Sequence, residues 1–169
     1  MPENEQTPED SNLLEEISYE GDQSPDFDAL LQSRPITAAP MGGMSEETQE
    51  KVVVSQWHVP CHCIFAKTRE GICRAFHVHL ETNWEQDQAL KEFGNQGAHT
   101  IVAKANRSWF GPNDERQLGH YKLSVDQVIH VNTSQWWRTL YDPSTDEVWI
   151  DDKIHRVLRK YRGFGRMAQ

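Results

Sequence analysis

The uneven distribution of charge along the chain most constrains how it can fold. Residues 1–50 contain thirteen Asp and Glu but a single base, Arg34, so this segment has a net charge of −12. The remaining residues contain thirteen acids (26 − 13) and sixteen bases (17 − 1), which gives +3. A segment so acidic, without Trp and rich in Pro, Ser and Gln, buries too little apolar surface to offset its ordering entropy. We therefore expect a disordered acidic arm over residues 1–50 and a single folded domain over residues 51–169.

We expect neither a membrane span nor a secretory leader. No apolar run approaches the roughly 20 residues that cross a bilayer, and the acidic N-terminus lacks the apolar core of a signal peptide. Three cysteines, an odd number, do not indicate a disulfide framework. These features predict an intracellular, cytoplasmic protein that is not secreted.

Two stretches of the arm carry apolar residues at helical spacing. Residues 11–19 predict one short helix, and a Ser-Pro pair typical of a helix start precedes Phe27, Leu30 and Leu31 at i, i+3 and i+4. Acidic segments with such anchors commonly dock into the groove of a protein partner. The alternative is that they pack weakly on their own domain.

The domain itself is expected to be α+β, with a mainly antiparallel sheet built from two hairpins. The hairpins are predicted over residues 61–80 and 136–151. Between them, Asn83 is a suitable N-cap for one central helix that ends at Gly94.

The C-terminal segment predicts an amphipathic basic helix. Apolar residues recur at i, i+3, i+4 and i+7 from Ile154, and from Lys153 onward the chain has six bases and no acid. Arg156, Arg159 and Lys160 would then lie on the solvated face, where they are candidates for binding nucleic acid. An ordinary solvated helix face is the alternative, and the acidic arm could also fold over these bases.

The most reactive side chains are concentrated in one place. All three cysteines and four of the eight histidines fall between Trp57 and Leu80. A three-residue loop closed by Gly71 would pair Thr68 with Ile72 in a hairpin. That register brings two thiols and two imidazoles onto one face, a donor set suited to a structural zinc ion. The predicted ligands are Cys61, Cys63, His77 and His79.

A shift of one residue changes this chemistry. His62 would then face His77, with His79 on the diagonal, and three imidazoles with an open position are typical of a catalytic metal site. The spacing Gly71-x5-His77-x-His79 also resembles the first metal motif of the cupin family. That resemblance implies a metal-dependent enzyme that also uses Glu85, although Glu85 falls in the predicted central helix. Without a metal, these residues are simply packed or exposed.

The favoured interpretation is a small binding or adaptor protein whose acidic arm recruits a protein partner. It includes the possibility of a structural zinc site on the 61–80 hairpin. The two alternatives are a metal-dependent enzyme that uses the hairpin histidines and a nucleic-acid-binding accessory protein that uses the basic C-terminal helix.

Overall fold

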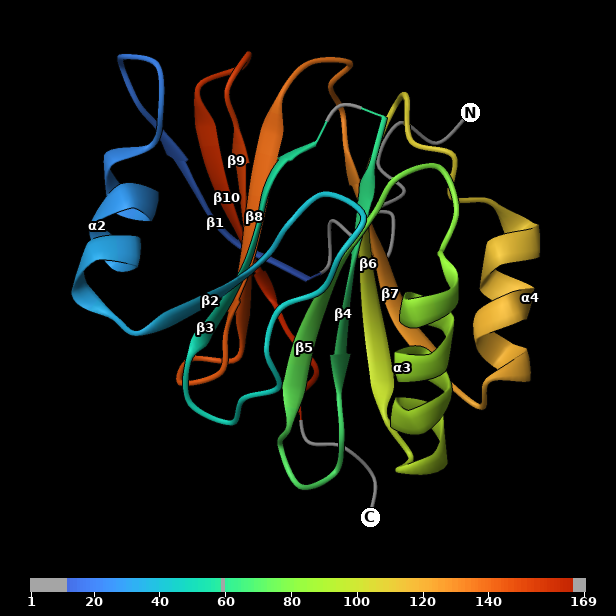
Figure 1. The fold of residues 1–169 in the computed structure, drawn as a ribbon. Coiled ribbons are helices and arrows are strands. Elements are labelled where there is room, and N and C mark those ends of the chain that lie inside the picture. Colours follow the sequence, from blue (N-terminus) through green and yellow to red (C-terminus); the bar gives the residue numbers. More distant parts are fainter. Residues whose placement is uncertain (1–11, 59, 166–169) are drawn as a thin grey trace.

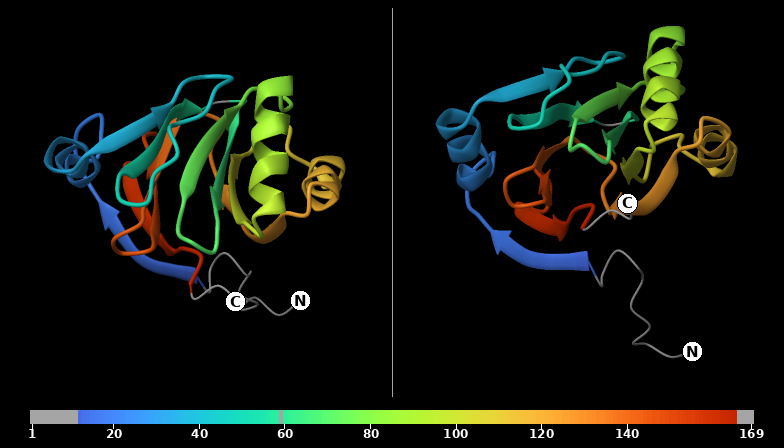
Figure 2. Two further views of the ribbon diagram at one scale, coloured as in Figure 1. Left: turned by 60° about the horizontal axis from the view of Figure 1, so that its bottom comes forward. Right: turned by 90° about the horizontal axis from the view of Figure 1, so that it is seen from below.

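Two β-sheets pack on each other and carry helices on their outer faces. The computed structural model describes residues 12–58 and 60–165. In Figures 1 and 2, α2 covers the outer face of one sheet, while α3 and α4 cover the outer face of the other. The helices are α2 (Pro25–Ser33), α3 (Trp84–Asn95) and α4 (Pro112–His120).

The larger sheet has six strands in the order β1-β10-β9-β8-β3-β2, and the smaller has four in the order β5-β4-β6-β7. The six are β1 (Leu13–Ser18), β10 (Val157–Arg162), β9 (Glu147–Asp152), β8 (Trp137–Asp142), β3 (Val52–His58) and β2 (Ile36–Ala39). The four are β5 (Cys73–Val78), β4 (His62–Lys67), β6 (His99–Ala105) and β7 (Ser124–Val131).

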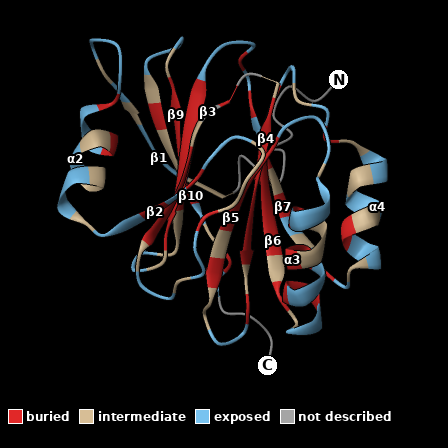
Figure 3. Ribbon diagram, in the orientation of Figure 1, coloured by how far each residue is buried: buried red, intermediate tan, exposed pale blue. Residues whose placement is uncertain are grey.

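Both sheets are buried on both faces over much of their area, as the red strands of Figure 3 show. The central core lies between the sheets and includes Phe65 of β4 and Tyr141 of β8. A second core lies under α3 and α4, and a third lies under α2, where Phe27 meets Val54 and Leu140. Burial on both faces explains why several strands lack a simple alternation of apolar and polar residues.

The predicted fold class is wrong in its main features. Over residues 12–58 and 60–165, the chain is mostly β, with 41% strand and 20% helix, three helices and two mixed sheets. The sheets are mixed because β2 pairs with β3 in parallel, and β6 pairs with β7 in parallel through the crossover helix α4. Local elements were nevertheless predicted correctly: Asn83 caps α3, β4 pairs with β5, and β8 pairs with β9. The single central helix is wrong, because α3 is one of three described helices and lies on the outer face of the smaller sheet.

The predicted C-terminal helix is also wrong, because this segment forms a third hairpin. Strand β10 pairs with β9 on one side and with β1 on the other. Asp152 organises the intervening turn by accepting a hydrogen bond from the backbone N–H of His155, and Arg156 adopts a left-handed φ of 53°. A short apolar run fits either periodicity, and here the two neighbouring strands satisfy the backbone of β10.

Most of the predicted disordered arm belongs to the fold. Residues 12–39 contribute β1, α2 and β2. Of residues 11–19, where a helix was expected, Leu13–Ser18 form the edge strand β1 instead, and residue 11 lies outside the described residues. The prediction of disorder is therefore wrong over residues 12–50, whereas its part over residues 1–11 lies outside the described residues.

Strand β1 brings acids of the arm onto bases of the C-terminal segment. Glu15 lies 3.3 Å from the ammonium of Lys160, and Glu16 lies 2.7 Å from the guanidinium of Arg159. Each pair is partly exposed, so each contributes at most about 1 kcal/mol. The opposite charges of the two ends thus favour this pairing of edge strands.

A buried ion pair anchors the arm to the larger sheet. The Arg138 guanidinium lies 2.8 Å from Asp151 and 2.7 Å from Asp28 of α2, and it stacks over the ring of Phe27 at 4.1 Å. Tyr19 donates a 2.5 Å hydrogen bond to the same Asp151 carboxylate. Burial and this acceptor raise the pKa of the Tyr19 hydroxyl, which therefore stays protonated as the donor.

We predict that Arg138→Met lowers the free energy of unfolding by about 3 kcal/mol, because it leaves the fully buried Asp151 without its cation. Urea denaturation at neutral pH measures the loss. The matched control Arg116→Met, on the exposed surface of α4, should change stability by less than about 0.5 kcal/mol. Equal effects in the two variants would show that Arg138 is not an anchor.

Candidate functional site

The 61–80 hairpin has the register expected from a three-residue loop. Thr68 and Ile72 close the loop through an N–H···O bond of 2.9 Å, and Gly71 adopts φ 90°. Cys63 pairs with His77 across β4 and β5. This prediction is confirmed, and the shifted register in which His62 would face His77 does not occur.

The register does not gather the four predicted zinc ligands into one cluster. Cys63 and His77 point into the core between the sheets, whereas Cys61 and His79 meet at the end of the hairpin, with Sγ and Nδ1 3.2 Å apart. Within the described ranges, no three His, Cys, Asp or Glu side chains are arranged to hold a metal ion. The zinc site and the metal-dependent enzyme thus remain predictions, and no group of metal-binding side chains among the described residues supports them.

Burial also disfavours the thiolate, which is the form of cysteine that binds metals and attacks substrates. It raises the pKa of Cys61 and of Cys63, and it raises that of Cys73 to about 11. All three thiols therefore stay protonated at neutral pH.

Three histidines are buried beside the β3–β4 connection in their neutral form. The ring of His77 stacks on that of His58 at 3.9 Å, which in turn stacks on Trp137 at 4.4 Å. On the other face of β4, His62 packs against the ring edge of Phe110. Burial lowers the pKa of His58 far below its usual value, that of His62 to about 3 and that of His77 to about 4.

Several strand ends converge at one end of the molecule, at the top of Figure 1. There β3 pairs its last residue, His58, with the first residue of β8, and the parallel strands β6 and β7 end together at Ala105 and Val131. Ligands commonly bind beyond the carboxyl ends of parallel strands. We call the connections at this end the upper loops; they comprise residues 79–83, 106–111, 132–136 and 153–156.

The upper loops expose large apolar side chains. Trp109 is 68% exposed, Trp136 51% and Ile154 54%, and Trp84 is exposed just after the first loop. Indole is usually largely buried in a folded domain, so several exposed indoles at one end are typical of an interaction surface.

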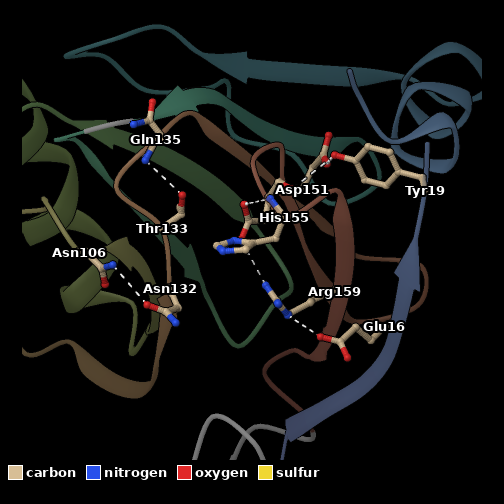
Figure 4. A network of polar contacts seen from close by, with 10 residues as sticks. Glu16, Tyr19, Asn106, Asn132, Thr133, Gln135, Asp151, His155 and Arg159 are labelled. Atoms are coloured by element: carbon tan, nitrogen blue, oxygen red, sulfur yellow. Dashed lines mark hydrogen bonds and ion pairs between the residues drawn. The ribbon is translucent and has the colours of Figure 1, made fainter. Parts of the chain in front are cut away.

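Polar contacts hold these loops in place (Figure 4). Asn106 and Asn132 join the second loop to the third through a 3.3 Å hydrogen bond. In the fourth, His155 lies 2.7 Å from the buried carboxylate of Asp152, which Arg159 approaches at 3.5 Å. The exposed apolar residues therefore project from an ordered frame.

A depression of about 600 Å³ opens between the first and second upper loops and the start of α4. Its apolar walls are Leu80 and Trp109, and Glu81 and Asp114 supply carboxylates. His79 links the depression to Cys61 beneath it. The depression combines apolar walls with a few polar groups, as ligand sites usually do. The lining residues are His79, Leu80, Glu81, Trp109, Asn113 and Asp114.

Of this lining, only His79 was predicted as a site residue from the sequence. Trp109 lies in a connection, followed by Phe-Gly-Pro, and only the fold brings it beside the end of the first hairpin. The signal that could have drawn attention to it is the presence of an indole in a polar connection, where such a side chain has little to bury against.

The predicted partner anchors of the arm are used within the molecule. Phe27 is fully buried, and Leu30 and Leu31 pack against the same core under α2. Phe27 is therefore not accessible to a partner while α2 is docked, and Leu30 and Leu31 are only partly exposed.

The predicted nucleic-acid contacts are also largely used within the molecule. Arg159 and Lys160 pair with acids of β1, while Arg156 is exposed in the β9–β10 turn. The acidic edge strand therefore offsets two of the three bases that would bind phosphates.

Comparison with known proteins gives no relative from which a function could be inferred: no model of a known protein family and no curated protein matches the chain. No helix within residues 12–58 and 60–165 is long and apolar enough to cross a bilayer.

We predict that acid destabilises the protein through the buried histidines. Between the unfolded pKa of about 6.5 and their lower folded values, the unfolded chain binds more protons, so stability falls as pH falls. Each histidine should cost about 2 kcal/mol between pH 7.5 and pH 5. Urea denaturation at both pH values should show that His77→Phe reduces this acid-dependent loss by that amount.

The exposed His120 provides the matched control, because His120→Gln removes an imidazole that the fold does not bury. Its acid-dependent loss should equal that of the unsubstituted protein. If His77→Phe also left the loss unchanged, His77 would not be held neutral by the fold.

Proposed function

We propose that this is a binding protein that holds a segment of a protein partner against the upper loops. The depression walled by Leu80 and the exposed Trp109 carries the proposal. It retains the binding class expected from the sequence but moves the contact away from the acidic arm, whose anchors α2 buries.

Three observations support a binding role. The exposed indoles offer large, rigid contact areas, and Trp is enriched among the residues that dominate binding energy. The polar network of Figure 4 keeps the loops ordered, which lowers the entropic cost of binding. Finally, the protonated thiols and the neutral buried histidines of the hairpin are packed in the core, so the accessible features of this region are those of a binding surface.

The backbone of Leu80 is strained. Its φ is 65°, a left-handed conformation that is costly for a residue with a Cβ, yet its side chain lies on the wall of the depression. Backbone strain of this kind is often found at ligand-binding sites.

The test is to select peptides that bind the full-length protein from a random 12-residue library displayed on phage. Synthetic copies are then titrated by fluorescence polarisation. Trp109→Ala should weaken binding at least tenfold, about 1.4 kcal/mol. Leu14→Ala, which truncates an exposed apolar residue of β1 on the other sheet, should change binding less than twofold. If every selected peptide bound Trp109→Ala as well as the original protein, the proposal would be refuted.

We further predict that Leu80→Gly has opposite effects on stability and binding. Glycine adopts the left-handed conformation without strain, so the free energy of unfolding should rise by about 1 kcal/mol. Loss of the apolar wall should weaken the selected peptides several-fold. Thermal denaturation and the same titration measure the two effects, and a fall in stability would show that Leu80 is not strained.

A further inference from the structure

We infer that the group recognised in the depression is a lysine or arginine side chain of the bound segment. This inference rests on the proposed function and names the chemistry of the partner. It follows from the charge, the helix starts and the aromatic wall of the depression.

Two carboxylates give the depression a negative charge. Glu81 comes from the loop after β5, and Asp114 from the first turn of α4, so the two carboxylates reach the depression from different elements. Over residues 12–58 and 60–165, the ion pairs of the chain engage other acids, and neither of these two carboxylates is paired with a base. A cationic side chain between them would supply the missing partner.

Two helix starts lie beside the depression. Both α3 and α4 begin at this end, and helix N-termini ordinarily favour anions. At α3 the chain satisfies this end itself, because Asn83 and Gln86 form a capping box. At α4 the N-cap Gly111 has no side chain to cap the helix, but the Asp114 carboxylate accepts the Gly111 N–H at 2.8 Å and places a negative charge at the helix start. An external anion would therefore face the two carboxylates of Glu81 and Asp114 at this end.

The wall of the depression is apolar and aromatic. The exposed indole of Trp109 lines the depression, and a cation over the face of an indole gains about 0.5–1 kcal/mol at an exposed site. Leu80 offers apolar contact to the methylene stem that both lysine and arginine carry. The depression thus matches both parts of a basic side chain, its charged head and its apolar stem.

The experiment uses the peptides selected from the random library against the full-length protein. Selected peptides should share a Lys or Arg whose replacement by Met weakens binding at least tenfold. The double variant Glu81→Gln/Asp114→Asn should weaken the original peptides by a similar factor, because asparagine keeps an acceptor for the α4 cap. Raising salt from 50 to 300 mM should also weaken binding, since the ions screen partly exposed charges.

A matched variant separates a local effect from the net charge of −9. Glu85→Gln/Glu92→Gln removes the same charge from exposed positions of α3 outside the depression, and it should change affinity less than twofold. Equal weakening by both double variants would overturn the inference. Peptides that need Trp109 but carry no essential base would also overturn it, while leaving the proposed function intact. Peptides that do not need Trp109 would overturn both.

Discussion

The Arg138 guanidinium, buried between the carboxylates of Asp151 and Asp28, holds the two ends of the sequence together. One carboxylate belongs to β9 and the other to α2, so this cation links the helix of the arm to the outer face of the larger sheet, and the ion pair of Arg34 with Asp142 of β8 adds a second link. A buried charge is tolerated only when it is paired, which makes the docking of α2 specific. Once α2 is docked, β1 and β2 are positioned on either side of it in the chain, and both add to the edges of the sheet.

This constraint changes where a partner can bind. The arm is the most acidic part of the chain and has the anchors of a recognition helix, but its apolar face is covered by its own sheet. The exposed apolar residues lie instead on the upper loops, which follow the carboxyl ends of β5, β6 and β7. Beneath those loops lies a core in which His58 and His77 stay neutral. We therefore expect the stability of the core next to the proposed binding site to fall as the pH falls.

Local signals in the sequence predicted the parts of the fold that local chemistry determines. Gly71 set the hairpin register, Asn83 set the start of α3, and Ser24 with Pro25 set the start of α2. Tertiary pairing decided the rest. Residues 157–162 became a strand because β9 and β1 flank them, and the acidic arm is ordered because Arg138 lies opposite Asp28. The depression could not be predicted, because Leu80 and Trp109 come from loops that only the assembled sheet brings together.

The most direct test of the account is native-state amide hydrogen exchange along the arm. If Arg138 makes the arm an integral part of the sheet, the most protected amides of α2 and β2 should exchange with a free energy close to that of β8 and β9, because one cooperative unit opens together. Exchange of residues 25–39 at the rate of an unstructured peptide, while β8 and β9 remain protected, would contradict it. In that case the arm would be free to recruit a partner through Phe27, Leu30 and Leu31, as its sequence alone suggests.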